Sequence, residues 1–544
     1  MRTSDYDVIV VGAGIAGLTA SAYLSKEKHR VLLVEKEPEC GGLLGAFKLD
    51  GHIIDKGARG IIDSGIVFSM MKQLGVDIEF LSNPVKMAVG SKSILLKDES
   101  SIDEYGSLLK ELYPNEKKDI DEIFFDVKRV MKYMDVLYGI DNPLFMSKPY
   151  DMKYLGKVLL PWMGKFIINM NKAMKMFEPV NDYLSKKTQN KALIHIIAQH
   201  FFTDTPTFFA LSYFTLYLQY HYPKGSTQVI VDKLSELIKQ QDGIILTNTQ
   251  VMSIDSDKKE MMTQDGQVFG YQQMIWTGDT NAFYKVLQTE SISNDSVRQK
   301  VNEKKALFKV MKGADSILSL VILVNQPLET YREFSGPHCF YTKRLEGLSN
   351  VKLSEIQDDQ KKFSTDKKVL FDWIKKYIEY NTFEISIPAL RDASLSPKGE
   401  TGLIVSTLFD FDLTKHIADL GFYEEFKQFI TEAIIEFFND EYWLNFKSSI
   451  TKTLVATPLT IQSRTFSTDG SVTGWSFGNH PFPVEYKFLK VSKAVLTPVA
   501  SIKQAGQFTF NPAGVPVAIL TGKLAADAVD KDLKKLKKRQ GKVT

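Results

Sequence analysis

The strongest constraint on the fold is a glycine pattern close to the N-terminus. Gly12-Ala13-Gly14-Ile15-Ala16-Gly17 is a G-x-G-x-x-G that follows the apolar run 8–11 and opens 15–25, where apolar residues recur at helical spacing. In a strand–turn–helix unit the first glycine permits the tight turn, the second lets the backbone approach a pyrophosphate, and the third lets helix pack on strand. The motif also occurs in turns without a ligand, but its context here predicts a Rossmann-type βαβ unit.

Glu35 supports a dinucleotide site. It ends the next predicted strand, 29–35, about twenty residues beyond the glycines, where a carboxylate accepts hydrogen bonds from adenosine ribose hydroxyls. The helix N-terminus adds amide donors and a positive dipole for the diphosphate. The predicted contacts are therefore Gly12, Ala13, Gly14, Ile15, Ala16, Gly17, Glu35 and Lys36.

Composition excludes several other classes. The 544 residues suggest two or three domains, and 44% hydrophobic with 24% charged residues is typical of a globular protein. A net charge of +3 gives no global basic field for nucleic acid. Two cysteines, Cys40 and Cys339, cannot form a disulfide framework or a cysteine-rich metal centre, and the eight histidines lack ligand spacing. We expect no metal site and a reducing, cytoplasmic setting.

We expect membrane contact, if any, to be peripheral. The N-terminus lacks a signal-peptide pattern, and no apolar run approaches the roughly 20 residues that span a bilayer. Segment 151–177 projects as an amphipathic helix, kinked at Pro161. Its apolar face holds Leu155, Leu159, Trp162, Phe166, Met170 and Phe177, and the opposite side Lys153, Lys157, Lys165, Lys172 and Lys175. The apolar face either docks on lipid or packs inside the protein.

The predicted fold class is mixed α/β, with a Rossmann-type domain assembled from discontinuous segments and a mixed-sheet substrate domain. Three α/β-like pieces of sequence, 1–85, 223–290 and 484–544, are expected to form the nucleotide-binding domain. Segments 86–106 and 309–483 are expected to form the substrate domain, and 107–222 a mostly helical insert that faces a membrane. The basic stretch 531–542 is expected to be solvated.

The sequence after Glu35 distinguishes FAD from NAD. Cys40-Gly41-Gly42-Leu43, and then Gly57-Ala58-Arg59, resemble the stretch of flavoprotein oxidases and desaturases in which a Gly-Gly pair follows the ribose-binding acid. The resemblance implies non-covalent FAD, with Gly41, Gly42, Leu43, Gly57, Ala58 and Arg59 among its contacts. Many relatives carry arginine directly after the pair. Leu43 stands there in this chain and cannot make the pyrophosphate contact of that arginine.

Nearly the whole chain resembles the phytoene desaturase, carotenoid isomerase and retinol saturase group. Segment 222–226, with 249–254, is similar to the family's second FAD-contacting region, in which Val251 would meet the adenine through its backbone and Ser226 replaces a more usual glycine. Segments 505–507 and 512–516 are similar to the terminal motif, which sets a helix N-terminus against the isoalloxazine. The contacts implied there are Gly506, Gln507, Gly514, Val515 and Pro516. The helix dipole would stabilise negative charge on reduced flavin.

Two further segments resemble the substrate domain of this group. Segment 386–397 is similar to its strand and turn, although the same residues also suit an irregular edge strand. Segment 456–460, with Gly470 and Gly474-Trp475 downstream, is most similar to the isomerase and saturase branch.

The resemblance implies an FAD-dependent reductase, isomerase or desaturase that acts on C–C double bonds of a long apolar polyene such as a carotenoid or retinoid. An unsaturated fatty acid is a second substrate class. A non-catalytic prenyl or lipid carrier and an amine oxidase are the alternatives. Flavin chemistry does not require a dedicated acid or base, so we assign no catalytic residue. Proton donors by residue type alone are Tyr213, Tyr217, His200 and His221. The sequence does not identify the redox partner.

Overall fold

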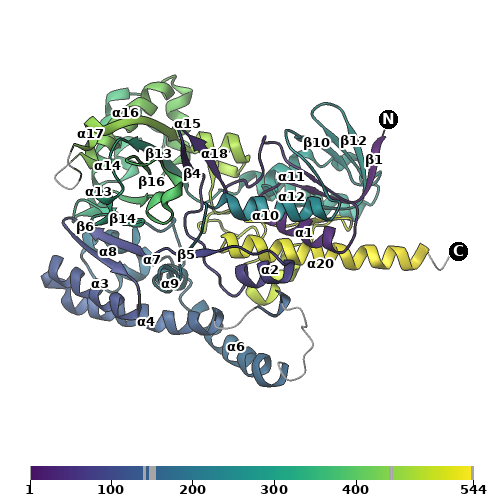
Figure 1. The fold of residues 1–544 in the computed structure, drawn as a ribbon, viewed down its shortest axis with the longest axis horizontal. Coiled ribbons are helices and arrows are strands. Elements are labelled where there is room, and N and C mark those ends of the chain that lie inside the picture. Colours follow the sequence, from purple (N-terminus) through teal and green to yellow (C-terminus); the bar gives the residue numbers. More distant parts are fainter. Residues whose placement is uncertain (1, 139–141, 146–154, 440–442, 444, 541–544) are drawn as a thin grey trace.

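Two mixed β-sheets, each with its own apolar core, organise the chain (Figure 1). The structure is a computed structural model, and it describes residues 2–138, 142–145, 155–439, 443 and 445–540.

Strands and helices follow one another along the chain without a regular βα repeat. The strands are β1 (Arg2–Val11), β2 (Val31–Val34), β3 (Ala46–Leu49), β4 (His52–Asp55), β5 (Phe80–Ser82), β6 (Val85–Val89), β7 (Lys92–Leu96), β8 (His221–Pro223), β9 (Ile244–Leu246), β10 (Val251–Asp255), β11 (Glu260–Thr263), β12 (Val268–Trp276), β13 (Ser316–Val324), β14 (His338–Thr342), β15 (Thr382–Ser386), β16 (Thr401–Phe409), β17 (Ile450–Ala456) and β18 (Ile502–Gln504). The α-helices are α1 (Ile15–Lys26), α2 (Val67–Leu74), α3 (Glu99–Leu112), α4 (Lys117–Tyr138), α6 (Leu160–Met174), α7 (Val180–Ser185), α8 (Lys191–Ala198), α9 (Thr207–Tyr217), α10 (Gln228–Gln240), α11 (Thr280–Val286), α12 (Asp295–Val310), α13 (Glu329–Arg332), α14 (Lys367–Tyr380), α15 (Phe411–Asp419), α16 (Tyr423–Phe438), α17 (Phe446–Ser449), α18 (Pro458–Thr465), α19 (Val491–Ala494) and α20 (Val515–Gln540).

The first sheet is assembled from three distant parts of the chain. Its order is β10-β11-β12-β1-β2-β9, and β18 pairs with β12. The pairs β12·β1, β1·β2, β2·β9 and β12·β18 are parallel, and Val8, Ile9 and Val10 in the middle of β1 are fully buried. Strands covered on both faces read as continuous apolar runs, which is why β1 and β2 are recognisable in the sequence. The predicted fold class, a Rossmann-type domain built from discontinuous segments with mixed sheets, is confirmed.

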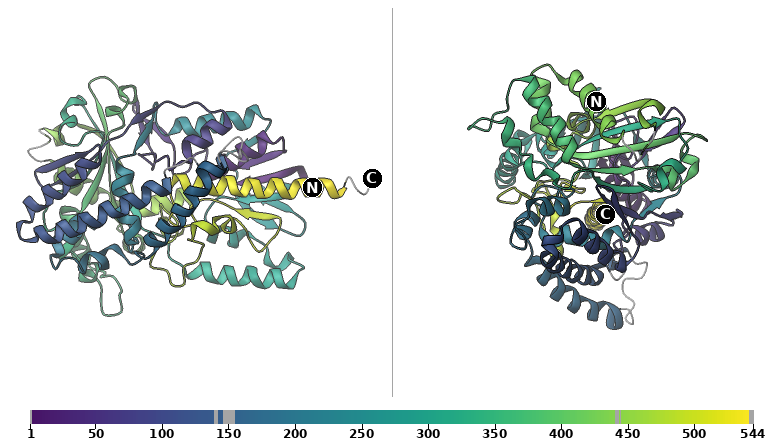
Figure 2. Two further views of the ribbon diagram at one scale, coloured as in Figure 1. Left: turned by 90° about the horizontal axis from the view of Figure 1, so that it is seen from below. Right: turned by 90° about the vertical axis from the view of Figure 1, so that its left-hand side faces the viewer.

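Helices α1 and α20 approach each other closely on one face of this sheet. A Cβ atom on Gly522 would lie 2.5 Å from the carbonyl oxygen of Ala16, so only glycine permits this distance. Figure 2 shows α20 as a long helix that runs along this domain to the C-terminus. It extends into the basic stretch expected to be solvated, where Lys534 pairs with Glu27 and Asp530 and continues the contact with α1.

The second sheet has the order β17-β13-β16-β15-β14-β6-β7. Helices α14 and α16 contribute to the apolar core on one of its faces, through residues such as Ile374 and Ile430. The sheet also corrects one expectation. Ser386 ends β15, which lies between β14 and β16, so the interpretation of this segment as an edge strand is wrong.

Helices α3, α4, α7, α8 and α9 share a separate core with β6 and β7, and α6 packs against α4 (Figure 1). The predicted amphipathic helix differs from expectation. Residues 151–154, including Lys153, lie outside the described part, 155–159 form a π-helical turn, and α6 starts at Leu160 with Pro161 in its first turn rather than at a kink. Proline suits this position because its missing N–H would have no intrahelical partner there.

The predicted apolar face of α6 turns inward. Met170 is buried, Trp162 and Phe166 are partly buried, and the indole N–H of Trp162 donates to the carbonyl of Val136 on α4 at 2.6 Å. Among the described residues, no helix combines the length and apolar character that crossing a membrane requires.

Candidate functional site

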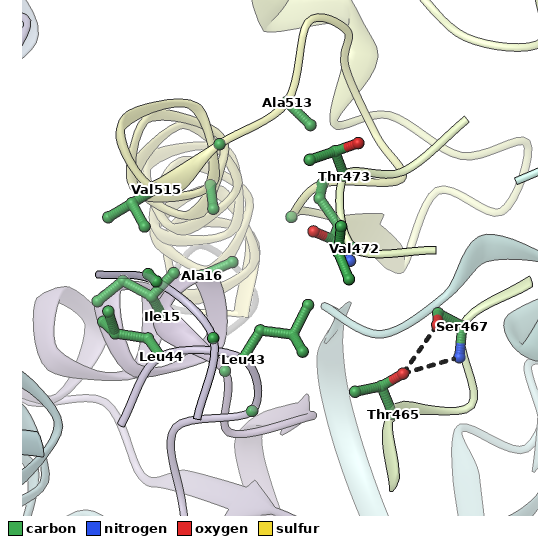
Figure 3. A pocket seen from close by; sticks show the side chains of 18 of the residues that line it. Ile15, Ala16, Leu43, Leu44, Thr465, Ser467, Val472, Thr473, Ala513 and Val515 are labelled. Carbon is green, nitrogen blue, oxygen red and sulfur yellow. Dashed lines mark hydrogen bonds between the residues drawn. The ribbon is translucent and has the colours of Figure 1, made fainter. Parts of the chain in front are cut away.

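A cavity of about 1030 Å³ lies between the first sheet, the second sheet and the helical insert. One part is lined by the glycine loop, the end of β2 and the start of α20. Another part is lined by α9 and by the open face of the second sheet. Figure 3 shows the part where Ile15, Ala16 and Val515 face the segment that carries Val472 and Thr473. All twenty residues predicted to contact the cofactor line this cavity except Ala13 and Gly17.

The glycine loop has the geometry that its sequence predicts. Gly12 has φ +98°, in the region that favours glycine, and a Cβ atom on Gly17 would lie 1.9 Å from the carbonyl oxygen of Gly12. Gly17 therefore lets α1 pack on the turn and does not itself reach the cavity. No atom lies within 4 Å of the Cβ position of Gly14, so the backbone at Gly14 is open to a ligand at the N-terminus of α1.

Glu35 is held at the end of β2 by backbone donors. One carboxylate oxygen accepts from the N–H of Ala13 at 2.7 Å, and the other accepts from the N–H of Glu37 at 3.0 Å. A carboxylate has about four lone-pair directions, so acceptor capacity remains for the vicinal hydroxyls of a ribose. Lys36 lies beside it, with its ammonium 4.1 Å from the centre of the Phe466 ring, while Val251 lines the same part of the cavity.

The Gly-Gly pair lies directly against the glycine loop. The N–H of Gly41 donates to the carbonyl of Ala13 at 2.8 Å, and Gly41 has φ +119°. The N–H of Ala58 donates to the carbonyl of Leu43, and a Cβ on Gly57 would lie 2.5 Å from that same oxygen. These contacts bring 41–43 and 57–59 to one wall of the cavity.

The start of α20 faces the same wall. Gly514, with φ +142°, and Val515 and Pro516 line the cavity in front of the first turn of the helix. Gly506 and Gln507 lie beside them, and the N–H of Gly506 donates to the hydroxyl of Thr521 on α20 at 3.0 Å. The N-termini of α1 and α20 thus both open onto the cavity, and unpaired first-turn N–H groups favour negative charge there.

Aromatic side chains line the other part of the cavity. Tyr213 and Tyr217 have ring centres 5.6 Å apart, and Phe209 lies 5.3 Å from Tyr213. His200 lines the same wall, and burial lowers its pKa to about 3, so the imidazole is neutral. Of the four proton donors considered by type, only His221 is not among the lining residues; its ring packs on Phe68 instead.

Arg59 connects the N-terminal glycine-loop region with the second sheet, between the glycine-lined part and the aromatic part of the cavity. Its guanidinium donates to Glu384 on β15 at 2.9 Å and to Ser406 on β16 at 2.6 Å. His338 on β14 contacts the other oxygen of Glu384 at 2.9 Å. The structure therefore places the Arg59 side chain against the second sheet, while its residue still lines the cavity predicted for the cofactor.

The ion pair between Arg59 and Glu384 sets the charge state of the cluster that these two residues form with His338. Burial acts to raise the pKa of the Glu384 carboxyl, but the Arg59 guanidinium and the His338 hydrogen bond outweigh burial and hold that pKa at about 2. Burial lowers the pKa of His338, against the opposing effect of Glu384. At neutral pH the cluster contains a carboxylate, a guanidinium and a neutral imidazole.

Sequence reasoning missed Glu384 and His338. The signal that could have identified Glu384 is the alternation of apolar and polar residues in segment 382–386. Phe383 and Ile385 are fully buried in the core of the second sheet. Strand alternation therefore puts Glu384 on the opposite face, which is the face that lines the cavity. Within the residues that the structure describes, no three His, Cys, Asp or Glu side chains are grouped to hold a metal ion.

Comparison with known proteins agrees with the site. The model of the NAD(P)-binding Rossmann-like domain matches residues 10–74. A prolycopene isomerase from Arabidopsis thaliana is 23% identical over 84% of this chain and 72% of its own length. A diapophytoene desaturase from Staphylococcus haemolyticus is 20% identical over 97% of this chain and 99% of its own length. An all-trans-retinol reductase from Danio rerio is 24% identical over 46% of this chain and 42% of its own length.

The chain is thus similar to the phytoene desaturase, carotenoid isomerase and retinol saturase group, and these matches support an oxidoreductase of the flavin-dependent type.

Solved structures with this fold include other oxidoreductases. One from Methanosarcina mazei has a TM-score of 0.60, at 14% identity over 96% of this chain and 99% of its own. Cyclohexylamine oxidase from Brevibacterium oxydans has a TM-score of 0.56, at 12% identity over 97% and 100%. At these identities the likeness concerns the fold alone, which this chain thus shares with an amine oxidase.

Removal of Arg59 should destabilise this protein in a pH-dependent way. Arg59→Gln leaves the Glu384 carboxylate, which is 30% exposed, without its buried counter-charge, so we expect the free energy of unfolding to fall by about 2–3 kcal/mol near pH 7. In the wild type the lowered pKa of Glu384 stabilises the fold above the ordinary carboxyl pKa, and this stabilisation is lost as pH falls towards the folded value. The difference between variant and wild type should therefore shrink at about pH 4. Urea unfolding at both pH values measures it.

Arg344→Gln is the matched control, since it removes an exposed ion pair with Glu379. We expect it to cost less than about 1 kcal/mol at either pH. An equal loss in both variants, or a loss for Arg59→Gln that grows at low pH, would contradict the account.

Proposed function

We propose that this chain is an FAD-dependent reductase, isomerase or desaturase that acts on C–C double bonds of a long apolar polyene such as a carotenoid or retinoid. The observation that carries the proposal is the continuity of one cavity, which joins the dinucleotide-type cradle to the aromatic wall of α9. A bound dinucleotide can thus meet an apolar chain inside the protein, away from bulk water.

The residues present fit FAD. The open backbone at Gly14, the remaining acceptor capacity of Glu35 and the second helix N-terminus at Val515 correspond to pyrophosphate, ribose and flavin ring. When bound, FAD supplies hydride transfer to or from carbon. The chain's own tasks are to hold the polyene against the ring and to exclude water.

The relatives support the polyene class. Two of them are named for carotenoid substrates, a prolycopene isomerase and a diapophytoene desaturase, and a third for retinol. An unsaturated fatty acid would suit the same apolar wall. A lipid carrier without flavin chemistry is disfavoured because the whole glycine cradle, Glu35 and the terminal motif are present.

The proposed function predicts conversion of a polyene. Purified protein reconstituted with FAD should change the double-bond pattern of a carotene or retinol, measured by chromatography of the products under oxidising and under reducing conditions. The reducing arm tests saturation and isomerisation, and the oxidising arm tests desaturation. Cyclohexylamine and oleic acid serve as comparison substrates. Conversion of the amine alone would contradict the proposal.

We also propose that α6 docks on a lipid surface, through residues other than those of the predicted face. The exposed apolar side chains are Val158, Leu160, Met163, Ile167 and Ile168, with exposed fractions between 38% and 63%. Exposed lysines such as Lys157, Lys165 and Lys172 lie on the same segment and suit the headgroup region.

Aromatic contacts lead from this surface towards the cavity. Phe177, three residues after α6, is 40% exposed and lies 6.1 Å from Phe208 between ring centres. Phe208 in turn lies 6.4 Å from Phe209, which lines the cavity. A lipid-soluble substrate would enter along this wall from a membrane with which a cytoplasmic protein makes peripheral contact.

Lipid docking is tested by replacing exposed apolar side chains with neutral polar ones. The double variant Leu160→Gln/Ile167→Gln should bind phosphatidylcholine vesicles about tenfold or more weakly, because each side chain contributes roughly 1.5–3 kcal/mol on burial. Co-sedimentation measures this. Val310→Gln, which removes a 69% exposed side chain from α12, is the control and should bind as the wild type does. Equal binding by all three proteins would contradict docking through α6.

A further inference from the structure

We propose that Glu384, together with Tyr217 and Tyr220, is a specificity-determining anchor for the polar end of the substrate. The group it selects is a neutral hydrogen-bond donor such as a hydroxyl at the end of an apolar chain. This inference rests on the proposed function, because it assumes that the cavity holds an apolar unsaturated lipid.

Arg59, His338 and Glu384 all line the cavity, and Glu384 is the most exposed of the three. Its side chain is 30% exposed, whereas those of Arg59 and His338 are 2% and 1% exposed. Both Glu384 oxygens already accept one bond each, from Arg59 and from His338, which fixes the carboxylate in place. The lone pairs that remain are available only to a molecule in the cavity.

Two tyrosines stand around this carboxylate. The ring of Tyr220 lies 5.6 Å from both Tyr217 and His338. The charge of Glu384 contributes to raising the pKa of Tyr217 and of Tyr220, after the larger effect of burial, so both phenols are neutral. Both residues line the cavity, and neither hydroxyl has a hydrogen-bond partner within the described part of the chain. Carboxylate and phenols therefore form a polar subsite in an aromatic wall.

Charge balance favours a neutral group over a cation. Arg59 matches the negative charge of Glu384, a second guanidinium on Arg391 lies over the Tyr222 ring nearby, and His338 is neutral. An ammonium would add an unmatched charge to a site whose Glu384 carboxylate is already paired. A hydroxyl adds none and can donate to the carboxylate.

A pure hydrocarbon end would be disfavoured for a different reason. It would remove water from the exposed face of the carboxylate and supply no donor in return, which leaves a charged acceptor unsatisfied. The cavity should therefore discriminate between two polyenes of equal length that differ only in a terminal hydroxyl.

The test is a binding comparison on FAD-loaded protein between a carotene and its terminally hydroxylated counterpart, measured from the shift in polyene absorption. We expect the wild type to bind the alcohol about tenfold or more tightly. In Glu384→Gln and in the double variant Tyr217→Phe/Tyr220→Phe, the two polyenes should bind with nearly equal affinity. The second variant keeps the ion cluster intact, and flavin content checks the fold of both.

Glu400→Gln is the matched control, because Glu400 also pairs with a buried histidine, His52, but does not line the cavity. It should keep the wild-type preference. Equal binding of the two polyenes by the wild type, or an unchanged preference in both subsite variants, overturns the anchor. Tighter binding of a terminal ammonium analogue that is lost in Glu384→Gln overturns the choice of a neutral donor. Failure to bind either polyene overturns the proposed function itself, and the anchor with it.

Discussion

The ion pair between Arg59 and Glu384 is the interaction on which the site depends. Arg59 belongs to the stretch that follows the dinucleotide loop, and Glu384 lies in the interior of the second sheet. The 2.9 Å contact and the bond to Ser406 hold two separately cored domains at one fixed spacing. Neighbouring groups add further hydrogen bonds to the pair, from His338 to Glu384 and from Arg59 to Ser406. Arg59, Glu384 and Ser406 all line the cavity that the cradle and the aromatic wall share.

The nucleotide half could be predicted from local sequence because its constraints are local. Gly12 needs a positive φ, Gly17 must leave room for a carbonyl oxygen, and Glu35 ends a buried strand. Each of these local requirements selects one residue type at a fixed position in the motif, which can be recognised in the sequence. Ser226 shows the limit of such rules. It adopts φ +93°, in the region that favours glycine, so the turn forms although the residue type best suited to it is absent.

The substrate half could not be predicted in the same way. Arg59 and Glu384 are separated by 325 residues, and their contact depends on how the two sheets meet. The amphipathic pattern of α6 correctly marked a helix and left open whether its apolar face packs inward, as it does, but it missed further apolar residues on the outer side. Helical periodicity identifies an apolar face and cannot say which neighbour covers it. Catalytic residues stay unassigned for the same reason, because His200, Tyr213 and Tyr217 reach the cavity without distinctive spacing.

The central claim is that the cradle at the two helix N-termini binds FAD beside an apolar chamber. The most direct measurement is the absorption spectrum of the purified protein, followed by heat release and identification of the chromophore. The account predicts the bands of oxidised flavin and released FAD at about one molecule per chain. A colourless protein that cannot be reconstituted with FAD would contradict it, and would favour a lipid carrier that keeps the fold without the chemistry.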